Sequence, residues 1–561
     1  MRHARFWIAV PVLGLAGTAI WASGCGTFGD ACLSPGNQDC NDLFGITGGG
    51  GSTSSSSMTT ASGTMASSST GMDPTCEGDI VEGLSEADTK RLISDKCGVF
   101  VRADAAGPTE DGTQAAPFRS LQKAIDEATN SKRVYACAKA PYAEALTIAV
   151  AVTMYGGFEC DQGWVWKAAT RSLITGAAQK VSLTLDNMAG GARIEGFKIT
   201  SASLTGQTGE SSIAVAVDAI AAELVACDVE AGDGADGVEG LPPAGPALKG
   251  TDAPVLIAAA TSACINPASL KSGVPGATTC DDGTSGGGAG AKGGITGTNN
   301  GDGATGANGT PAVASTGKGG AGQDGTNACV AGSAGKDGIA GVAGGAGTSP
   351  GTLSLTGLTS TPGADGTDGT AGSKGQGGGG GGGAKSGVFC QGSVDGNGAS
   401  GGGGGAGGCG GKGGGAGKAG GSSIAIISLG TKLVLTNVTL KGGKGGNGGK
   451  GTAGQGGGLV GLGANGGAGS GFAGSKPGCK GGDGGQGGAG GPGGGGRGGH
   501  SLGLAVLGTP LVSALPFTPG TPGDGGFAGM GGSPTGDGSK GLGGTATAAC
   551  WDFAKNSTCA Q

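Results

Sequence analysis

The sequence predicts an all-β fold in which short strands stack into a parallel β-solenoid with glycine-rich arrays inserted between its coils. Strand-like segments recur about every 20 residues between positions 133 and 229, separated by glycine turns. One strand–turn–strand unit returns 211 positions later, and glycine occupies every third position along several runs. The short strands also fit a β-sandwich, but the internal repeat favours the solenoid.

The composition argues against a single large core and a nucleic-acid-binding surface. Glycine contributes 140 of the 561 residues, whereas aromatic residues make up 4% and charged residues 13%. So little apolar volume predicts one or two compact parts with glycine-rich arrays attached. The formal net charge is −7, and no basic face is visible that could neutralise phosphates. We therefore expect no nucleic-acid partner.

The N-terminus is typical of a secretion signal, which we place at 1–24. Arg2 and Arg5 precede an apolar run that is too short for a comfortable membrane span. Small residues then lead to Cys25, a pattern that resembles the bacterial lipobox and implies lipidation of Cys25. Gly26, rather than an acidic residue, directly follows Cys25. We therefore expect an outer-membrane lipoprotein, on the cell surface or the periplasmic face. The alternative is ordinary cleavage before Cys25 and a secreted product.

Three small elements are expected before the main β region. A cysteine-containing segment, 25–46, leads into 47–73, which is almost wholly Gly, Ser, Thr and Met and predicts a flexible tether. Residues 76–97 predict a disulfide-closed element with a short helix that starts near Ser85. Apolar positions on one side of 117–130 predict an amphipathic helix that covers an apolar surface.

Short strands form the expected β region at 98–237, which begins with a strand at 99–101. Several of them alternate apolar and polar residues with period two. No amphipathic helices separate them, which argues against doubly wound α/β folds. The other expected strands are 133–137, 146–149, 152–155, 172–175, 181–185, 192–199, 213–217 and 224–229.

The internal repeat extends the expected solenoid beyond 237. Ser211 and the strand after it return at Ser422, the same shift aligns Leu224 with Leu435, and a third copy begins at Ser501. These copies predict further coils, with the glycine-rich arrays bulging outward between them. The coils are 422–441 and 500–516, the arrays are 238–421, 442–499 and 517–547, and a C-terminal cysteine loop occupies 548–561.

Residues 117–125, 154–158 and 194–199 resemble right-handed parallel β-helix proteins of the pectin-lyase-like superfamily. The resemblance covers 98–237 well and the later copies weakly. It implies a right-handed parallel β-helix with an N-terminal capping helix, and it is specific for fold rather than function. The glycine arrays are similar to those of PGRS-type surface proteins, and the whole chain resembles bacterial outer-surface lipoproteins that combine both features.

Two states are open to the glycine arrays. Glycine loses more conformational entropy than other residues on ordering, which favours disorder. A strict period of three favours instead a packed bundle of polyglycine helices of the polyproline II type, similar to the cores of certain glycine-rich antifreeze proteins and phage adhesins. We expect packing. Collagen is disfavoured because Pro492 is the only proline in the longest run.

Sixteen cysteines in an exported chain predict disulfides. Lipidation of Cys25 leaves an odd number, and Cys227, in an apolar strand, is the expected free thiol. Cysteines in or beside the glycine-rich segments are expected to join neighbouring extended helices; these are Cys329, Cys390, Cys409 and Cys479. The expected local pairs are Cys32–Cys40, Cys76–Cys97, Cys137–Cys160, Cys264–Cys280 and Cys550–Cys559.

A carboxylate group is the candidate metal site. Asp228, Asp233 and Asp236 predict a calcium site, because calcium binds carboxylate, carbonyl and water oxygens. The alternative is the ordinary Asp–Gly chemistry of a turn. Two histidines and the lack of a CxxC motif disfavour zinc, and no other cofactor is expected.

An aromatic group is the candidate carbohydrate site. Tyr155, Trp164 and Trp166 lie around a Gly–Gly pair, where their rings could stack on a sugar. The alternative is that they cover the end of a coil.

These features predict a non-enzymatic structural or adhesive lipoprotein, held in the membrane through Cys25 and facing polysaccharide or cell-surface matrix. The alternative is a polysaccharide-active enzyme of the pectin-lyase-like type. The family's chemistry uses acidic residues grouped around calcium and a basic residue on a facing coil. No such basic residue is identifiable, so no catalytic residue is assigned. A third option, binding to ice or crystal surfaces, lacks the regular threonine array that it needs.

Overall fold

The computed structural model describes residues 74–559, apart from 129–132, 219–220, 256–259, 356, 360–371, 388–389, 391–395, 430–431, 472–473, 509–514, 532–535 and 546–548. The chain divides into two units, Met1–Ala66 and Ser67–Gln561, and every described residue belongs to the second. The signal at 1–24, Cys25, the segments 25–46 and 47–73, and the Cys32–Cys40 pair lie outside the described residues.

Two short α-helices precede or border the sheets. α1 (Glu86–Leu92) begins after Ser85, whose hydroxyl accepts the Asp88 N–H at 3.0 Å. α2 (Leu121–Glu127) begins after Ser120, and its buried face packs against the core of the sheets. These side-chain caps satisfy N–H groups that have no partner within the helix. Within the described ranges, neither helix has the length and hydropathy of a membrane span.

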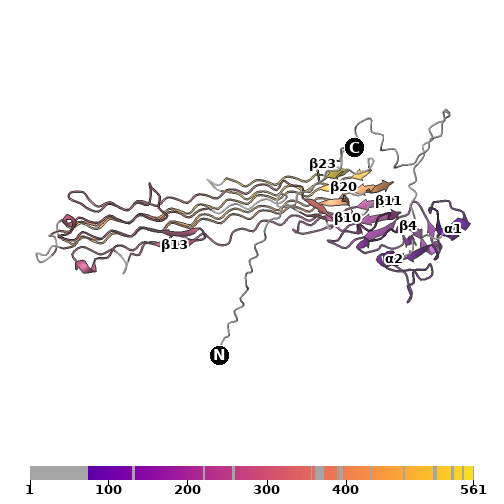
Figure 1. The fold of residues 1–561 in the computed structure, drawn as a ribbon, viewed down its shortest axis with the longest axis horizontal. Helices are drawn as coiled ribbons and strands as arrows, with labels where there is room; N and C mark the ends of the chain where they lie inside the picture. The colour runs from indigo at the N-terminus through magenta and orange to yellow at the C-terminus, as the bar shows by residue number, and fades with distance from the viewer. Residues whose placement is uncertain are drawn as a thin grey trace, which may run out of the picture. The chain divides into compact units, whose positions relative to one another are not determined.

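Three sheets carry most of the strands (Figure 1). The first contains β1 (Gly98–Val101), β2 (Arg133–Cys137), β4 (Thr153–Glu159), β8 (Arg193–Glu195), β11 (Glu223–Val225) and β18 (Val434–Thr436), with β5 (Val165–Trp166) paired to β4. The second contains β23 (Ser557–Thr558), β22 (Cys550–Asp552), β20 (Ser501–Val506), β17 (Ser423–Ser428), β10 (Ser212–Val217), β7 (Leu183–Leu185) and β3 (Leu146–Ile148). The third contains β21 (Phe517–Thr518), β19 (Thr439–Lys441), β12 (Asp228–Glu230), β9 (Phe197–Thr200) and β6 (Ser172–Thr175).

One apolar core is shared by the three sheets. Leu183 of β7, Ile194 of β8 and Ile199 of β9 are fully buried in the same cluster. The second sheet is also covered on its other face, where Ile424 and Leu353 pack together and where the hairpin β15 (Thr352–Ser354)–β16 (Gly357–Thr359) lies. Burial on both faces explains why β10 and β17 are nearly continuous apolar runs rather than alternating ones.

The sequence repeat is also the register of strand pairing. β10 pairs with β17 in parallel so that Ser212 faces Ser423, and β11 pairs with β18 so that Leu224 faces Leu435. β20 continues the ladder, with Ser501 next to Ser423. Residues that match in sequence are therefore neighbours in space.

The prediction of an all-β, right-handed parallel β-helix is wrong. The first two sheets are mixed, because β4 pairs with β5 and β22 pairs with β23 in antiparallel fashion. The strands do not close into a solenoid within the described residues, and they form a minority of the chain. The glycine-rich arrays are not loops inserted in a solenoid, because their segments hydrogen-bond to one another and form a second body.

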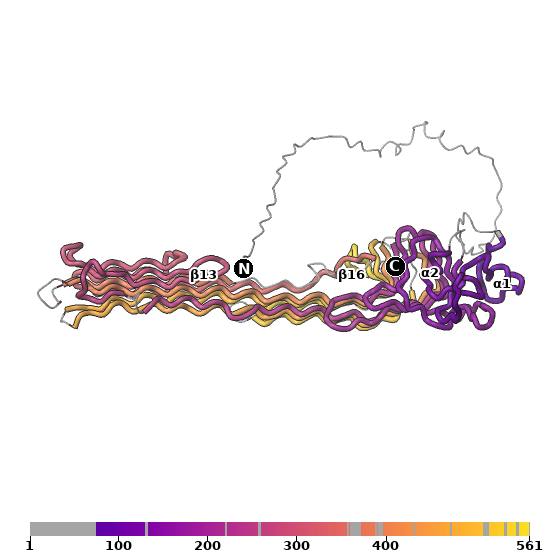
Figure 2. Tube along the Cα trace, turned by 90° about the horizontal axis from the view of Figure 1, so that it is seen from below, coloured from indigo at the N-terminus to yellow at the C-terminus, as the bar shows by residue number. Residues whose placement is uncertain are grey.

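That second body consists of extended segments that run side by side away from the sheets (Figures 1 and 2). We call it the glycine-rich bundle. Two of its segments are joined by an antiparallel hairpin, β13 (Ala277–Cys280) with β14 (Gly283–Gly286). Its segments are 232–253, 270–280, 283–294, 301–310, 316–323, 329–348, 372–386, 396–421, 442–469, 478–499, 520–530 and 538–544.

Candidate functional site

Backbone hydrogen bonds, one every third residue, hold the segments of the glycine-rich bundle together. Along one pair of neighbours, the N–H groups of Gly332, Gly335 and Gly338 donate to the carbonyls of Lys480, Asp483 and Gln486 at 2.8–3.0 Å. A three-residue extended helix has no internal hydrogen bonds and turns the same face to a neighbour every third residue. The period of three in the sequence is therefore the period of contact between segments.

Glycine occupies the contact positions because the segments approach each other too closely for a side chain. A Cβ atom on Gly335 would lie 2.0 Å from the carbonyl oxygen of Gln376, and one on Gly484 would lie 2.1 Å from that of Ala406. Both obstacles are backbone atoms, which cannot move aside as the tip of a flexible side chain can. Alanine is excluded from these positions by sterics alone.

The run Gly377–Gly383 shows the packing in its most complete form. Its seven consecutive N–H groups donate in turn to carbonyls of three different neighbouring segments, with N···O distances of 2.9–3.0 Å. The accepting carbonyls are those of Thr310, Gly405, Ser333, Ala307, Gly402, Val330 and Ala304. Three other segments donate back to its carbonyls, for example from Gly288, Gly320 and Gly482. Six neighbours surround this segment, and every residue in it is glycine for that reason.

The density of glycine reports how many faces of a segment are in contact. The peripheral run 332–343 has glycine at one position in three, the run 481–491 at two in three, and 377–383 at all three. Periodicity alone does not reveal this gradient. Reading glycine density as well would have located the centre of the bundle from the sequence.

Disulfides join bundle segments that are distant in sequence. Cys264 pairs with Cys390, Cys280 with Cys409 and Cys329 with Cys479, across separations of 126, 129 and 150 residues. The predicted Cys264–Cys280 pair is therefore wrong. The predicted pairs that form in the structure are Cys76–Cys97, Cys137–Cys160 and Cys550–Cys559.

Cys227 is the free thiol among the described residues, and it is buried in the core of the sheets. Burial raises the pKa of the Cys227 thiol to about 12. An inert, packed thiol is expected at such a position.

Outward positions of the bundle carry exposed apolar side chains. On one peripheral segment Ile339 is 72% exposed and Val342 is 69% exposed. On another, Leu459 is 64% exposed and Leu462 is also exposed. Within each pair the residues are three positions apart, so they project from the same side of their segment. We call these two pairs the apolar rows.

The predicted aromatic group is not an exposed stacking platform. Tyr155 is 1% exposed and Trp164 is 5% exposed, and both lie in an aromatic cluster with Phe100 on the first sheet. The Trp166 indole N–H donates to the Gly156 carbonyl at 2.9 Å, and its ring is partly buried. The cluster covers the face of the first sheet.

The three predicted calcium ligands are used instead to join the two copies of the repeat. Asp228 accepts from the Thr439 hydroxyl, Asp233 accepts from the Lys444 N–H and Asp236 accepts from the Asn447 N–H, each partner 211 residues later. No group of three metal-ligating side chains is found in the part of the chain that the structure describes. These contacts follow the alternative, in which the acids belong to turns.

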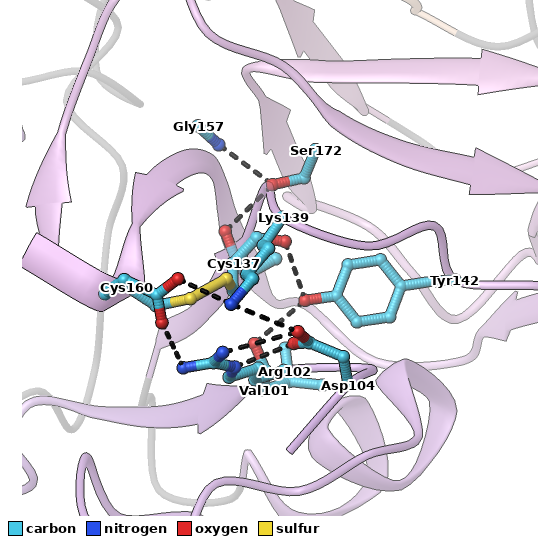
Figure 3. Close-up of a disulfide and its surroundings, with 11 residues drawn as sticks. Val101, Arg102, Asp104, Cys137, Lys139, Tyr142, Gly157, Cys160 and Ser172 are labelled. Atoms are coloured by element: carbon cyan, nitrogen blue, oxygen red, sulfur yellow. Dashed lines mark hydrogen bonds and ion pairs between the residues drawn. A yellow bond between two sulfur atoms is a disulfide. The ribbon is translucent and has the colours of Figure 1, made fainter. Parts of the chain in front are cut away.

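A cluster of four charged side chains lies beside the Cys137–Cys160 disulfide (Figure 3). Arg102 contacts Asp104 at 2.7 Å and Asp161 at 2.8 Å, and Lys139 contacts Asp161 at 2.6 Å and Asp104 at 3.6 Å. The hydrogen bond to Asp161 raises the pKa of Lys139, so its ammonium stays protonated. Alternating charges with a protonated lysine form a structural ion-pair network rather than a proton-abstracting site.

Buried hydroxyls support the backbone around the same disulfide. The Tyr142 hydroxyl lies 2.8 Å from the Val101 carbonyl and 2.9 Å from that of Cys137, and Ser172 donates to the Ala136 carbonyl while it accepts the Gly157 N–H (Figure 3). These groups satisfy main-chain atoms and leave no reactive hydroxyl.

Compared with known proteins, the chain matches no family model, no curated protein and no solved structure.

Proposed function

We propose that this chain is a non-enzymatic structural or adhesive protein, in which the glycine-rich bundle displays side chains to polysaccharide or cell-surface matrix. The observation that carries the proposal is that, within a peripheral segment, the inward positions pack against neighbouring segments while the outward positions are exposed. Glycine and backbone hydrogen bonds make the close contacts between segments, so exposed side chains such as those of Ile339 and Val342 are not needed for that packing. Such a surface can change its chemistry without loss of the fold.

The apolar rows support binding rather than a purely mechanical role. Soluble proteins cover most large apolar side chains, and apolar groups gathered at the surface mark interaction sites. The side chains of Ile339, Val342, Leu459 and Leu462 are mostly exposed, whereas their segments approach their neighbours through glycine. Contact with a partner is the physical reason that accounts for their chemistry.

The sequence around Cys25 supports a cellular location for this binding activity. A lipidated Cys25 followed by the Gly/Ser/Thr segment 47–73 would hold the bundle away from an outer membrane, at the cell surface. Mass spectrometry of the protein purified from membranes tests this part: an unmodified Cys25 contradicts the anchor and leaves a secreted protein.

Adhesion can be tested with the purified mature chain on beads coated with chitin, polygalacturonate or octyl groups, in buffer with calcium. We expect retention on at least one surface. The double variant Ile339→Ser/Val342→Ser should lose most of that retention, and its melting temperature should not change. Ala334→Ser/Lys336→Ser, at exposed positions of the same segment, is the matched control and should be retained like the wild type.

The same beads separate adhesion from catalysis. Ultraviolet absorbance of unsaturated uronates in the polygalacturonate supernatant would show lyase activity and contradict a non-enzymatic role. Equal, negligible retention on all three coatings would contradict adhesion to these classes of surface.

A further inference from the structure

A small cavity lies where the bundle joins the second sheet, immediately before β10, β17 and β20. Its volume is about 20 Å³, and its lining includes Ser211, Ser422, Arg497 and His500. A cavity of about 10–15 Å³ is enough for one water-sized particle. The space is therefore sufficient for a single monatomic ion or a water molecule.

Two buried nitrogen donors of this lining have no acceptor. Among the residues that the structure describes, neither the Nε of Arg497 nor the Nε2 of His500 has a hydrogen-bond partner. The two residues are 9% and 1% exposed, respectively. No described carboxylate lies within ion-pair distance of Arg497, whose Nη1 donates to the Thr348 carbonyl. A buried guanidinium without a counter-charge is strongly unfavourable.

The hydrogen bond at the other side of the His500 ring fixes its tautomer. The Thr545 N–H donates to Nδ1 at 3.1 Å, so Nδ1 is an acceptor and the ring proton is on Nε2. Burial and the nearby charge of Arg497 lower the pKa of His500 to about 3, so the ring is neutral at physiological pH. Nε2 is therefore an N–H donor without an acceptor.

In the two earlier copies of the repeat, a serine takes the place of His500 and its side chain likewise accepts a backbone N–H. The Ser211 hydroxyl accepts the Ser422 N–H, and the Ser422 hydroxyl accepts the His500 N–H, both at 2.9 Å. Ser211, Ser422 and His500 thus occupy equivalent positions in successive layers, each accepting a backbone N–H from the next. Each serine oxygen keeps its own proton, which adds hydroxyl donors to the lining.

We propose that this cavity binds one small monovalent anion of the halide class, which accepts from Arg497 and His500 and neutralises the buried guanidinium. Chloride is the abundant member of that class. A water molecule would satisfy the donors but would leave the charge without compensation. The bound anion would join the bundle to the sheets at the layer where the three repeats meet.

Bromide and chloride are the probes for a test on the full mature chain. Crystals soaked in bromide should show an anomalous peak between Arg497 Nε and His500 Nε2. In solution, the ³⁵Cl resonance should broaden on addition of the protein, and the melting temperature should be higher in chloride than in gluconate at equal ionic strength.

Variants separate the site from general salt effects. Arg497→Met should abolish both the ³⁵Cl broadening and the difference between chloride and gluconate. Arg133→Met removes another buried arginine with unpartnered nitrogens, outside this lining, and should keep both. An ordered water without an anomalous peak, or a peak without any chloride-dependent melting, would overturn the proposal. Equal chloride responses in the two variants would also overturn it.

Discussion

The sheets and the glycine-rich bundle are built in opposite ways. In the sheets, side chains such as Leu183 and Ile426 fill the interior and lie fully buried. In the bundle, the interior contains backbone: a Cβ on Gly380 would lie 1.9 Å from the Ala289 carbonyl oxygen. The first region depends on apolar burial and the second on hydrogen bonds between main chains. One chain therefore follows two different rules for which substitutions it tolerates.

The disulfides differ between the two regions in the same sense. Those beside the first sheet, Cys76–Cys97 and Cys137–Cys160, span 21 and 23 residues. Those in the bundle span 126 to 150 residues. Segments that lack interlocking side chains gain more from covalent links between distant parts of the chain, since a longer closed loop restricts the unfolded state more.

The largest expected effect is a side chain placed at the centre of the bundle. Gly380→Leu should lower the free energy of unfolding by more than about 4 kcal/mol, because it overpacks a site enclosed by backbone. Gly456→Leu is the matched control, since nothing lies within 4 Å of a Cβ at Gly456. Urea unfolding measures both. Similar losses in the two variants would contradict the packing of 377–383.

The second expected effect concerns the long-range disulfides. Cys329→Ser with Cys479→Ser should cost about 2–5 kcal/mol of unfolding free energy, as loss of a disulfide that closes a long loop does. The Cys76–Cys97 disulfide closes a loop of 21 rather than 150 residues, so Cys76→Ser with Cys97→Ser should cost less unfolding free energy. Denaturation curves of the two variants rank the two losses of unfolding free energy. A larger loss from removal of Cys76–Cys97 would contradict the proposed difference between the disulfides of the two regions.

The third effect is a pH dependence at the boundary between the regions. The pKa of His500 is lowered to about 3 in the folded chain, against an ordinary value of 6.5. The unfolded chain therefore binds more protons between these values, and stability falls as the pH drops from 6.5 towards 3. The slope from this group approaches about 1.4 kcal/mol per pH unit.

His500→Gln isolates that contribution. Glutamine can still accept the Thr545 N–H but does not titrate, so its stability curve in chloride-free buffer should be flatter below pH 6.5 than that of the wild type. The difference between the two curves removes the shared titration of the carboxylates. Parallel curves would show that His500 does not titrate in this way.

The smallest expected effect lies in the core of the sheets. Ile426→Val removes one methylene from a fully buried side chain and should cost about 0.5–1.5 kcal/mol. The side chains around Ile426 can relax into the small cavity. The backbone carbonyls around Gly380 cannot move aside for an added atom. A loss as large as that of Gly380→Leu would erase the distinction between the two regions.

Local and repeated signals were readable from the sequence. Ser85 caps α1 as its capping-box pattern indicates, and the shift that aligns Leu224 with Leu435 is their pairing register. The glycine arrays pack, as their strict period favoured. These features depend on neighbours in sequence or on an exact internal match, so no knowledge of the tertiary fold was needed.

Long-range placement was not readable. Cys264 and Cys280 look like a local pair, but the chain between them makes a turn through the 3-10 helix Pro267–Ser269 and then enters the bundle, where the two cysteines meet Cys390 and Cys409 instead. The sequence leaves open whether Tyr155 and Trp164 stack on a sugar or cover the fold, and in the structure they are buried in one cluster with Ile80 and Ile93. The β-helix prediction was wrong because short strands alone do not show how sheets close.

The seven-glycine run 377–383 has a consequence for how the bundle changes length in evolution. A peripheral segment such as 332–347 has a phase: adding or removing three residues preserves which side is bare, while one or two residues turn bulky groups inward. An unbroken glycine run presents the same backbone atoms in every direction, so no position in it has to face a particular neighbour. Single-residue insertions should therefore be tolerated within 377–383, whereas peripheral segments can change length only by whole triplets.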